Sequence, residues 1–177
     1  MTATGIVRRI DDLGRVVVPK EMRRKLRWRP GAPVEIFTAP DGVICLKRYT
    51  SVGEDKILAQ QLADSMAQES GYIVCVSDMY HIIAVGGGAK AQFLDREISL
   101  ALENVINARK HVTSEHMPII NDEKVCSVYP QVIISPIISE GDAVGAIIIL
   151  SKEADIAESE VILAKTSAHF LADQLAI

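Results

Sequence analysis

Basic side chains at helical spacing are concentrated near the N-terminus of this 177-residue chain. Four of them follow one another at positions i, i+3, i+4 and i+7, the spacing of one helical stripe: Lys20, Arg23, Arg24 and Arg27. Three further arginines precede this stripe: Arg8, Arg9 and Arg15. The planar guanidinium of arginine can hold a phosphate or a guanine edge with two hydrogen bonds, whereas lysine serves mainly as a phosphate contact. These residues therefore predict a surface that binds a polyanion.

The distribution of charge along the chain supports this interpretation. Residues 1–50 contain eleven Lys and Arg against five Asp and Glu, a net charge of +6, whereas residues 51–177 contain eight against eighteen, a net charge of −10. A charged helix face is often merely solvated, and an acidic substrate or an anionic membrane could use the same positive field. The short helix lacks the large apolar face of a membrane-binding helix. We therefore expect nucleic acid as the partner and no membrane.

A short module of strands and one helix must position these basic residues. Turn residues, a valine-rich run and a proline at the helix start indicate the order strand, strand, helix, strand, strand. The predicted elements are strands at 5–10 and 15–18, a helix at 20–27, and strands at 34–39 and 43–49. The turn Pro40-Asp41-Gly42 is a strong hairpin signal between the last two strands. Fifty residues usually bury too little surface to fold without disulfides, a metal or a partner chain.

The cysteines Cys45, Cys75 and Cys126 are widely spaced and fit no metal-binding pattern. We expect buried thiols in a reducing cytosol, except that Cys126 stands in a polar segment where it could be exposed and oxidised. No secretory signal follows the first methionine, and the longest apolar run, residues 143–150, is far too short to span a bilayer. These features predict a cytoplasmic protein.

The acidic remainder has the pattern of a mixed globular domain. Residues 50–53 mark the boundary, where the charge balance changes sign. Beyond it, the periodicity predicts helices at 54–69, 93–109 and 157–175, strands at 72–76 and 81–85, a long loop at 111–131 with room for a short strand, and a hairpin of strands 132–138 and 143–150. The apolar spacing of the last helix is equally typical of pairing with another helix and of covering its own sheet.

No catalytic or metal-binding constellation is found in this sequence. The run from Gly86 to Lys90 lacks the full phosphate-loop pattern, and a flexible loop is the simpler interpretation. The four histidines are scattered, and only His111 and His116 are near one another, without the spacing of a metal site. We therefore expect no enzyme, no metal and no cofactor.

The stretch TGIVRRIDDLGRVVVPKEMRRKL, residues 4–26, resembles the AbrB-type swapped-hairpin DNA-binding domain of bacterial transition-state regulators. The strand arginines, LGRVVVP and the Arg-Arg pair occur together in the family's order, and the resemblance covers about residues 1–50. It implies that two chains exchange hairpins to form one interlocked dimer. It also implies DNA contacts at Arg8, Arg15, Arg23 and Arg24, with Arg9 in an adjacent basic position. Antitoxins of this family continue into a flexible tail, whereas this chain continues into a globular pattern, so we do not expect an antitoxin.

The acidic part resembles a GAF domain in its order of elements, without the signature residues of the cyclic-nucleotide binders. Such domains often bind small molecules beside an output domain. The whole chain resembles sporulation transcription regulators built from these two domains, which implies a location in the cytoplasm of the developing spore, the forespore.

These observations predict an α+β protein with an N-terminal swapped-hairpin β-barrel dimer module at 1–52 and a GAF-like antiparallel sheet with flanking helices at 53–177. The expected function is sequence-selective regulation of transcription on double-stranded DNA, by activation or repression. The predicted DNA-binding residues are Arg8, Arg9, Arg15, Lys20, Arg23 and Arg24. The second domain would sense an unidentified small molecule or fix the oligomeric state, and a tetramer of two swapped dimers is expected. The alternative is a small-molecule sensor whose basic module serves only oligomerisation.

Overall fold

The computed structural model describes residues 5–26, 28, 30–31, 33–49, 52, 56–153 and 156–175. Contacts within the chain divide it into two compact units, Met1–Tyr49 and Thr50–Ile177. Val52 is almost fully buried in the hydrophobic core of the second unit. Among the described residues, no helix is both long and apolar enough to cross a membrane.

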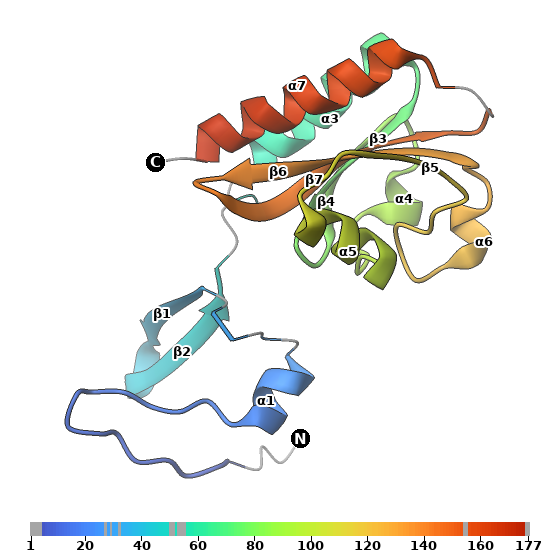
Figure 1. Cartoon of the computed structure of the whole chain (residues 1–177). Coiled ribbons are helices and arrows are strands. Elements are labelled where there is room, and N and C mark those ends of the chain that lie inside the picture. The colour runs from blue at the N-terminus through green and yellow to red at the C-terminus, as the bar shows by residue number, and fades with distance from the viewer. Residues whose placement is uncertain are drawn as a thin grey trace. The chain divides into compact units, whose positions relative to one another are not determined.

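The described part of the N-terminal unit contains one helix and one β-hairpin (Figure 1). The hairpin pairs β1 (Val34–Ala39) with β2 (Val43–Arg48) in antiparallel register across the 3-10 turn Pro40–Gly42, which confirms the predicted hairpin. Helix α1 (Lys20–Lys25) begins after Pro19, as expected. A backbone N–H at the start of a helix has no acceptor within the helix, so the missing N–H of proline costs nothing there. It ends two residues before the predicted end, and Arg27 lies outside the described residues.

The strands predicted at 5–10 and 15–18 are not formed within the single chain. The two segments are joined by a turn in which Asp11 N–H donates to Arg15 O at 3.1 Å and Gly14 N–H donates to Asp11 O at 2.9 Å. A β-strand requires a ladder of backbone hydrogen bonds to a neighbouring strand. The described part of this chain supplies no such ladder to either of these two segments, the first arm (residues 5–10) and the second arm (residues 15–18). The prediction was therefore wrong for one chain taken alone.

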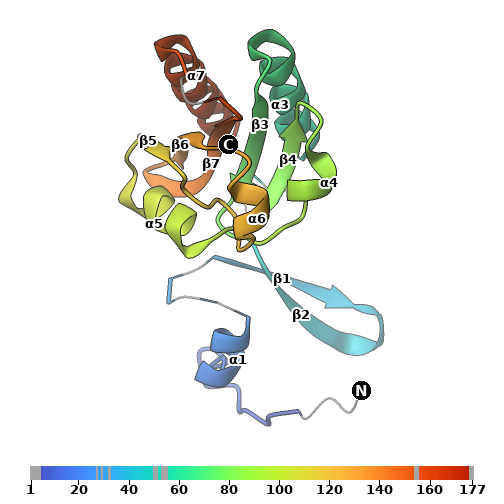
Figure 2. The same cartoon turned by 90° about the vertical axis from the view of Figure 1, so that its right-hand side faces the viewer.

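The C-terminal unit is built around a five-stranded antiparallel sheet in the order β4-β3-β7-β6-β5. Its strands are β3 (Ile73–Asp78), β4 (Ile82–Gly86), β5 (Val112–Glu115), β6 (Gln131–Ser139) and β7 (Asp142–Ser151). Helices α3 (Lys56–Ser70) and α7 (Glu158–Leu175) cover one face (Figures 1 and 2). The other face is covered by α4 (Lys90–Phe93), α5 (Leu100–Ala108) and α6 (Glu123–Cys126). The sheet and its long first and last helices agree with the predicted pattern.

Alternating side chains on the central strands fill two separate hydrophobic cores. Val74 and Val76 on β3 pack with the α3 and α7 side, whereas Cys75 between them packs with the α5 side. On β7, Ile147 packs with the α3 and α7 side and Ile148 packs with the α5 side. Successive residues of a strand point to opposite faces, so a continuous apolar run indicates a strand buried on both sides.

The helix predicted over 93–109 is interrupted in the structure. Asp95 has a positive φ of 59°, and Ile98 forms an isolated β-bridge with Ile120, so the chain between α4 and α5 is not helical. Helix α5 then begins at Leu100, and the side chain of Ser99 before it caps the helix by accepting a hydrogen bond from Leu102 N–H at 3.1 Å. Pairing with a distant segment has overridden a helical pattern that looked continuous in the sequence.

The segment predicted as a loop with a short strand, residues 111–131, contains both β5 and the short helix α6. Strand β5 pairs with β6, with Val112 opposite Ile134. Asp122 caps α6 by accepting a hydrogen bond from Val125 N–H at 3.2 Å. The hairpin predicted next is confirmed: β6 and β7 are joined by Glu140 and Gly141, with φ values of 51° and 87°. Two positive φ angles are typical of a tight hairpin turn.

Candidate nucleic-acid interface

All six predicted DNA-binding residues lie in the N-terminal unit, on the two arms and on α1. Arg8 and Arg9 lie on the first arm, Arg15 begins the second, and the other three belong to α1. Five of the six are exposed, whereas Arg23 is half-buried. Exposure leaves a guanidinium or ammonium group available to phosphates, which is the first requirement for binding DNA.

Arg15 is held in place by Asp11 across the turn between the two arms. Its Nε donates to Asp11 Oδ2 at 2.8 Å, and its backbone N–H donates to Asp11 Oδ1 at the same distance. The N–H of Leu13 also donates to Oδ1, at 3.0 Å. The hydrogen bonds from the backbone and then the guanidinium of Arg15 lower the pKa of the Asp11 carboxyl, with a smaller contribution from Leu13. Asp11 was not among the predicted site residues, and only its place in a turn pointed to it.

Gly14 permits this turn. Its φ is +75°, and no atom lies within 4 Å of the position that a Cβ would occupy. The left-handed conformation, and not a lack of space, is therefore the reason for glycine at this position.

Arg23 differs from its neighbour Arg24 in its contacts. The Nε of Arg23 donates to the backbone oxygen of Val18 at 3.2 Å, so the guanidinium connects α1 to the arm that precedes it. Arg23 also borders a cavity of about 300 Å³, together with apolar residues that include Val17 and Trp28. Arg24 is exposed and lies in the last turn of α1, where a positive side chain is favoured by the helix dipole.

The two arms and the turn between them also expose many apolar side chains. Six of them are between 50% and 92% exposed: Ile6, Val7, Ile10, Leu13, Val16 and Val17. Scattered exposed apolar residues are ordinary, but a group of this size on two short segments is typical of a surface that another chain covers.

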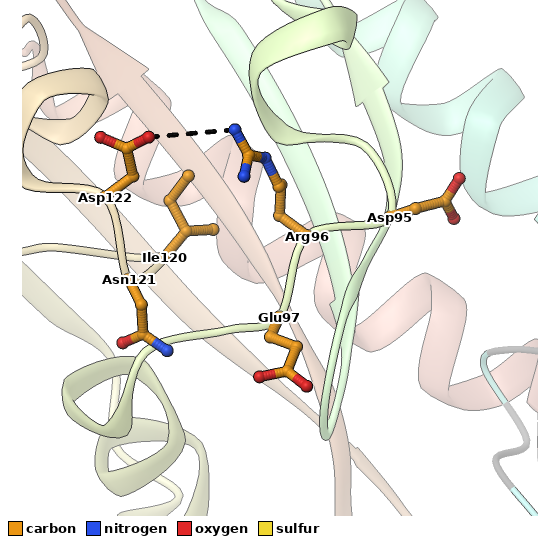
Figure 3. Close-up of a pocket in the computed structure, with 6 residues that line it drawn as sticks. All are labelled: Asp95, Arg96, Glu97, Ile120, Asn121 and Asp122. Carbon is orange, nitrogen blue, oxygen red and sulfur yellow. Dashed lines mark ion pairs between the residues drawn. The ribbon is translucent and has the colours of Figure 1, made fainter.

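The C-terminal unit has an open cavity of about 350 Å³ on the side of its short helices (Figure 3). It is lined by residues 95–97 and 120–122. Arg96 and Asp122 point toward one another across it, with Nη2 and Oδ2 3.9 Å apart, and Asp95 points away (Figure 3). The β-bridge between Ile98 and Ile120 holds the two lining segments side by side.

In the part of the chain that the structure describes, no group of three or more His, Cys, Asp or Glu residues could hold a metal ion. The sequence left open that Cys126 is exposed and open to oxidation, but Cys126 is only 8% exposed and its Sγ lies 3.7 Å from Ile120 O. Complete burial raises the pKa of the Cys75 thiol far above its ordinary range, which keeps it protonated and unreactive.

Comparison with known proteins shows relatives of each unit. Residues 55–176 match the family described as stage V sporulation protein T C-terminal, transcription factor. Residues 7–54 match the family described as antidote-toxin recognition MazE, bacterial antitoxin. Stage V sporulation protein T of Bacillus subtilis is 41% identical over 99% of both chains. The transition state regulatory protein AbrB of the same organism is 35% identical over 42% of this chain and 76% of AbrB.

Among solved structures, the C-terminal unit resembles the GAF domain of a phosphoenolpyruvate-protein phosphotransferase from Acinetobacter. The TM-score is 0.57 with 12% identity, over 68% of this chain and 81% of that one. At this identity the likeness concerns the fold alone, and it confirms the predicted GAF-like sheet with flanking helices.

An AbrB-like domain followed by a GAF-like domain defines a two-domain transcription regulator, which confirms the predicted fold class. More particularly, the chain belongs to the stage V sporulation protein T family of transcription factors. The resemblance of the whole chain to sporulation transcription regulators is thereby confirmed.

Proposed function

We propose that this protein regulates transcription of sporulation genes by binding double-stranded DNA through residues 1–52. The observation that carries the proposal is the exposure of five basic residues, on an N-terminal region whose net charge is +6 in an otherwise acidic chain. The relationship to stage V sporulation protein T supports a role in sporulation, in the cytoplasm of the developing spore. Activation and repression are both compatible with this surface.

In this proposal, phosphate neutralisation supplies affinity and arginines supply selection. Lys20, Arg9 and Arg24 are exposed and serve as phosphate contacts, which release counterions from DNA. Arg15 and Arg8 flank the turn and are the candidates for reading base edges. Arg23 contributes by fixing α1 to the preceding arm.

Two chains are proposed to exchange their N-terminal arms. The six exposed apolar side chains of the arms, and the absence of a backbone ladder to them in the described residues, support a second copy as the partner. Pairing with that copy would supply the missing hydrogen bonds and bury the apolar side chains, and both effects are favourable.

Residues 53–177 are proposed to join two such dimers into a tetramer. On α7, Ile162 is 60% exposed and Phe170 is 44% exposed, eight positions apart and thus on one side of the helix. Ile57 on α3 is 74% exposed. Helix pairing between copies would remove these side chains from water.

A second candidate function is the sensing of a small polar molecule by the C-terminal unit. It is favoured by the open cavity beside Arg96 and Asp122, whose mixed charges suit a polar ligand (Figure 3). A thermal-shift screen with metabolites, run beside DNA binding, separates the candidates. A large ligand-induced shift in a protein without DNA affinity would favour a sensor whose basic module serves only oligomerisation.

The DNA-binding proposal is tested by fluorescence anisotropy on promoter DNA at several salt concentrations. If a dimer neutralises roughly six to ten phosphates, its affinity should fall by about three to five powers of ten between about 50 and 200 mM salt. Arg24→Ala should weaken binding and flatten the salt slope. Lys110→Ala, which removes an exposed cation from the C-terminal unit, is the control. A flat salt response in the wild type would reject the proposal.

A further inference from the structure

We propose that Asp11 is a positioning residue, which holds the guanidinium of Arg15 in the orientation that reads a base edge and thereby sets sequence discrimination. The inference rests on the proposed DNA-binding function. It concerns a carboxylate in the basic region, where a negative charge weakens attraction to phosphates and so needs a reason.

The two oxygens of the Asp11 carboxylate have different tasks. Oδ1 accepts hydrogen bonds from the backbone N–H groups of Leu13 and Arg15, at 3.0 and 2.8 Å, and so closes the turn. Oδ2 accepts a hydrogen bond from Nε of Arg15 at 2.8 Å, and so fixes the side chain. Backbone geometry and side-chain direction are therefore controlled by one residue through separate atoms.

The ion pair leaves Arg15 available to a ligand. The Arg15 side chain is 70% exposed, and the bond to Asp11 uses Nε, so the Nη edge of the guanidinium fork can still donate to an acceptor on DNA. A long side chain that is already held in one direction loses less conformational freedom on binding. It also reorients less easily toward an acceptor that lies in a different position on another DNA sequence. Asp11 would thus reduce the overall affinity for DNA and increase the difference in affinity between the preferred sequence and other sequences.

Asp12 provides a matched comparison. It is also exposed and carries the same charge one residue further along the chain, but no hydrogen bond or ion pair of its side chain is seen in the described structure. Any effect of charge alone should therefore be shared by Asp11→Asn and Asp12→Asn.

Asparagine at position 11 separates the two tasks of the carboxylate. Its amide oxygen can still accept the two backbone hydrogen bonds that close the turn, but its NH₂ group cannot accept from Nε of Arg15. Asp11→Ala removes both. Thermal unfolding of each variant reports whether the turn has been kept.

The experiment uses the full chain and two duplexes of equal length, the sequence most enriched by the wild type from a random library and a scrambled version. Asp12→Asn should tighten binding to both duplexes by the same factor. Asp11→Asn should tighten binding to the scrambled duplex similarly, but its ratio of selected to scrambled affinity should fall about tenfold, as expected for loss of one good base contact. In an Arg15→Ala background, Asp11→Asn should leave the ratio unchanged, because the coupled partner is gone.

Two outcomes would overturn the inference in different ways. If Asp11→Asn and Asp12→Asn give the same ratio of affinities, Arg15 does not need Asp11, although the protein still binds DNA. If the wild type enriches no sequence and binds neither duplex, the proposed function itself fails, and the role of Asp11 fails with it.

Discussion

At the scale of single residues, the adjacent arginines of α1 are the clearest case of one residue type with two kinds of surroundings. Arg23 donates to Val18 O and is half-buried, whereas Arg24 is exposed. The sequence places both on one helical stripe and gives no reason to separate them. Their substitution should therefore have different consequences.

Arg24→Ala should weaken DNA binding and reduce the salt slope by about one per protomer, with stability changed by less than about 0.5 kcal/mol. Arg23→Ala should in addition lower the free energy of unfolding by about 1 kcal/mol, because Val18 O loses its donor. Anisotropy and denaturant unfolding measure the two effects. Equal losses of stability in the two variants would contradict the assignment.

We expect His111 to make the stability of the C-terminal unit depend on pH. Both ring nitrogens of His111 are buried. Burial lowers the pKa of His111, the positive charge of Lys165 on α7 lowers it further, and the backbone of Ile134 on β6 acts in the opposite direction. The folded chain therefore binds this proton less tightly than the unfolded chain does.

The stability that depends on neutral His111 should be complete above the unfolded pKa of about 6.5, and should be lost as the pH falls through it toward the lower folded pKa. His111→Gln should therefore show a smaller fall of unfolding temperature between about pH 7 and pH 5 than the wild type. Lys165→Gln should reduce the fall only in part. An unchanged pH dependence in His111→Gln would show that another group is responsible.

At the scale of elements, the contact between α3 and β4 depends on a glycine. A Cβ at Gly86 would overlap the backbone oxygen of Ala63 on α3 and would also touch Ala67. The helix therefore packs directly against the strand backbone. Since the obstacle is backbone, a side chain at this position cannot be accommodated by a rotamer change.

Gly86→Ala should lower the free energy of unfolding of the C-terminal unit by about 3 kcal/mol or more, measured by denaturant unfolding. Gly88→Ala is the control: no atom lies within 4 Å of its Cβ position, but its φ of +94° should cost about 1–2 kcal/mol. If the Gly86 variant were no less stable than the Gly88 variant, α3 would not pack as closely as described.

Elements defined by local turns were predictable, and those defined by distant partners were not. The turns at Pro40–Gly42 and at Glu140 and Gly141 identified the hairpins β1–β2 and β6–β7, because the turn residues themselves fix the chain reversal. The break between α4 and α5 depends on Ile98, which bridges to Ile120 and donates to Tyr80 O at 2.8 Å. The residues next to Ile98 in the sequence do not predict those contacts.

At the scale of the whole molecule, the exposed apolar side chains of α7 predict the oligomeric state. Phe170→Gln should convert a tetramer into a dimer, because it removes apolar area from the proposed contact between helices. The change is measured as molecular mass by analytical ultracentrifugation. His169→Gln alters the adjacent exposed residue and should leave the mass unchanged. A dimeric mass for the wild type would reject the proposed tetramer.

Local sequence patterns were enough to predict the partition of the chain into a basic and an acidic part and the hairpins β1–β2 and β6–β7. They also predicted the strands with two buried faces and the long helices α3 and α7. These features depend on charge, periodicity and turn chemistry, which act over a few residues. Contacts in the folded chain showed that Arg23 donates a hydrogen bond while Arg24 is exposed, that Asp11 holds Arg15, and that Cys126 is buried. Those outcomes depend on which atoms the rest of the chain brings within contact distance, and local sequence does not encode that.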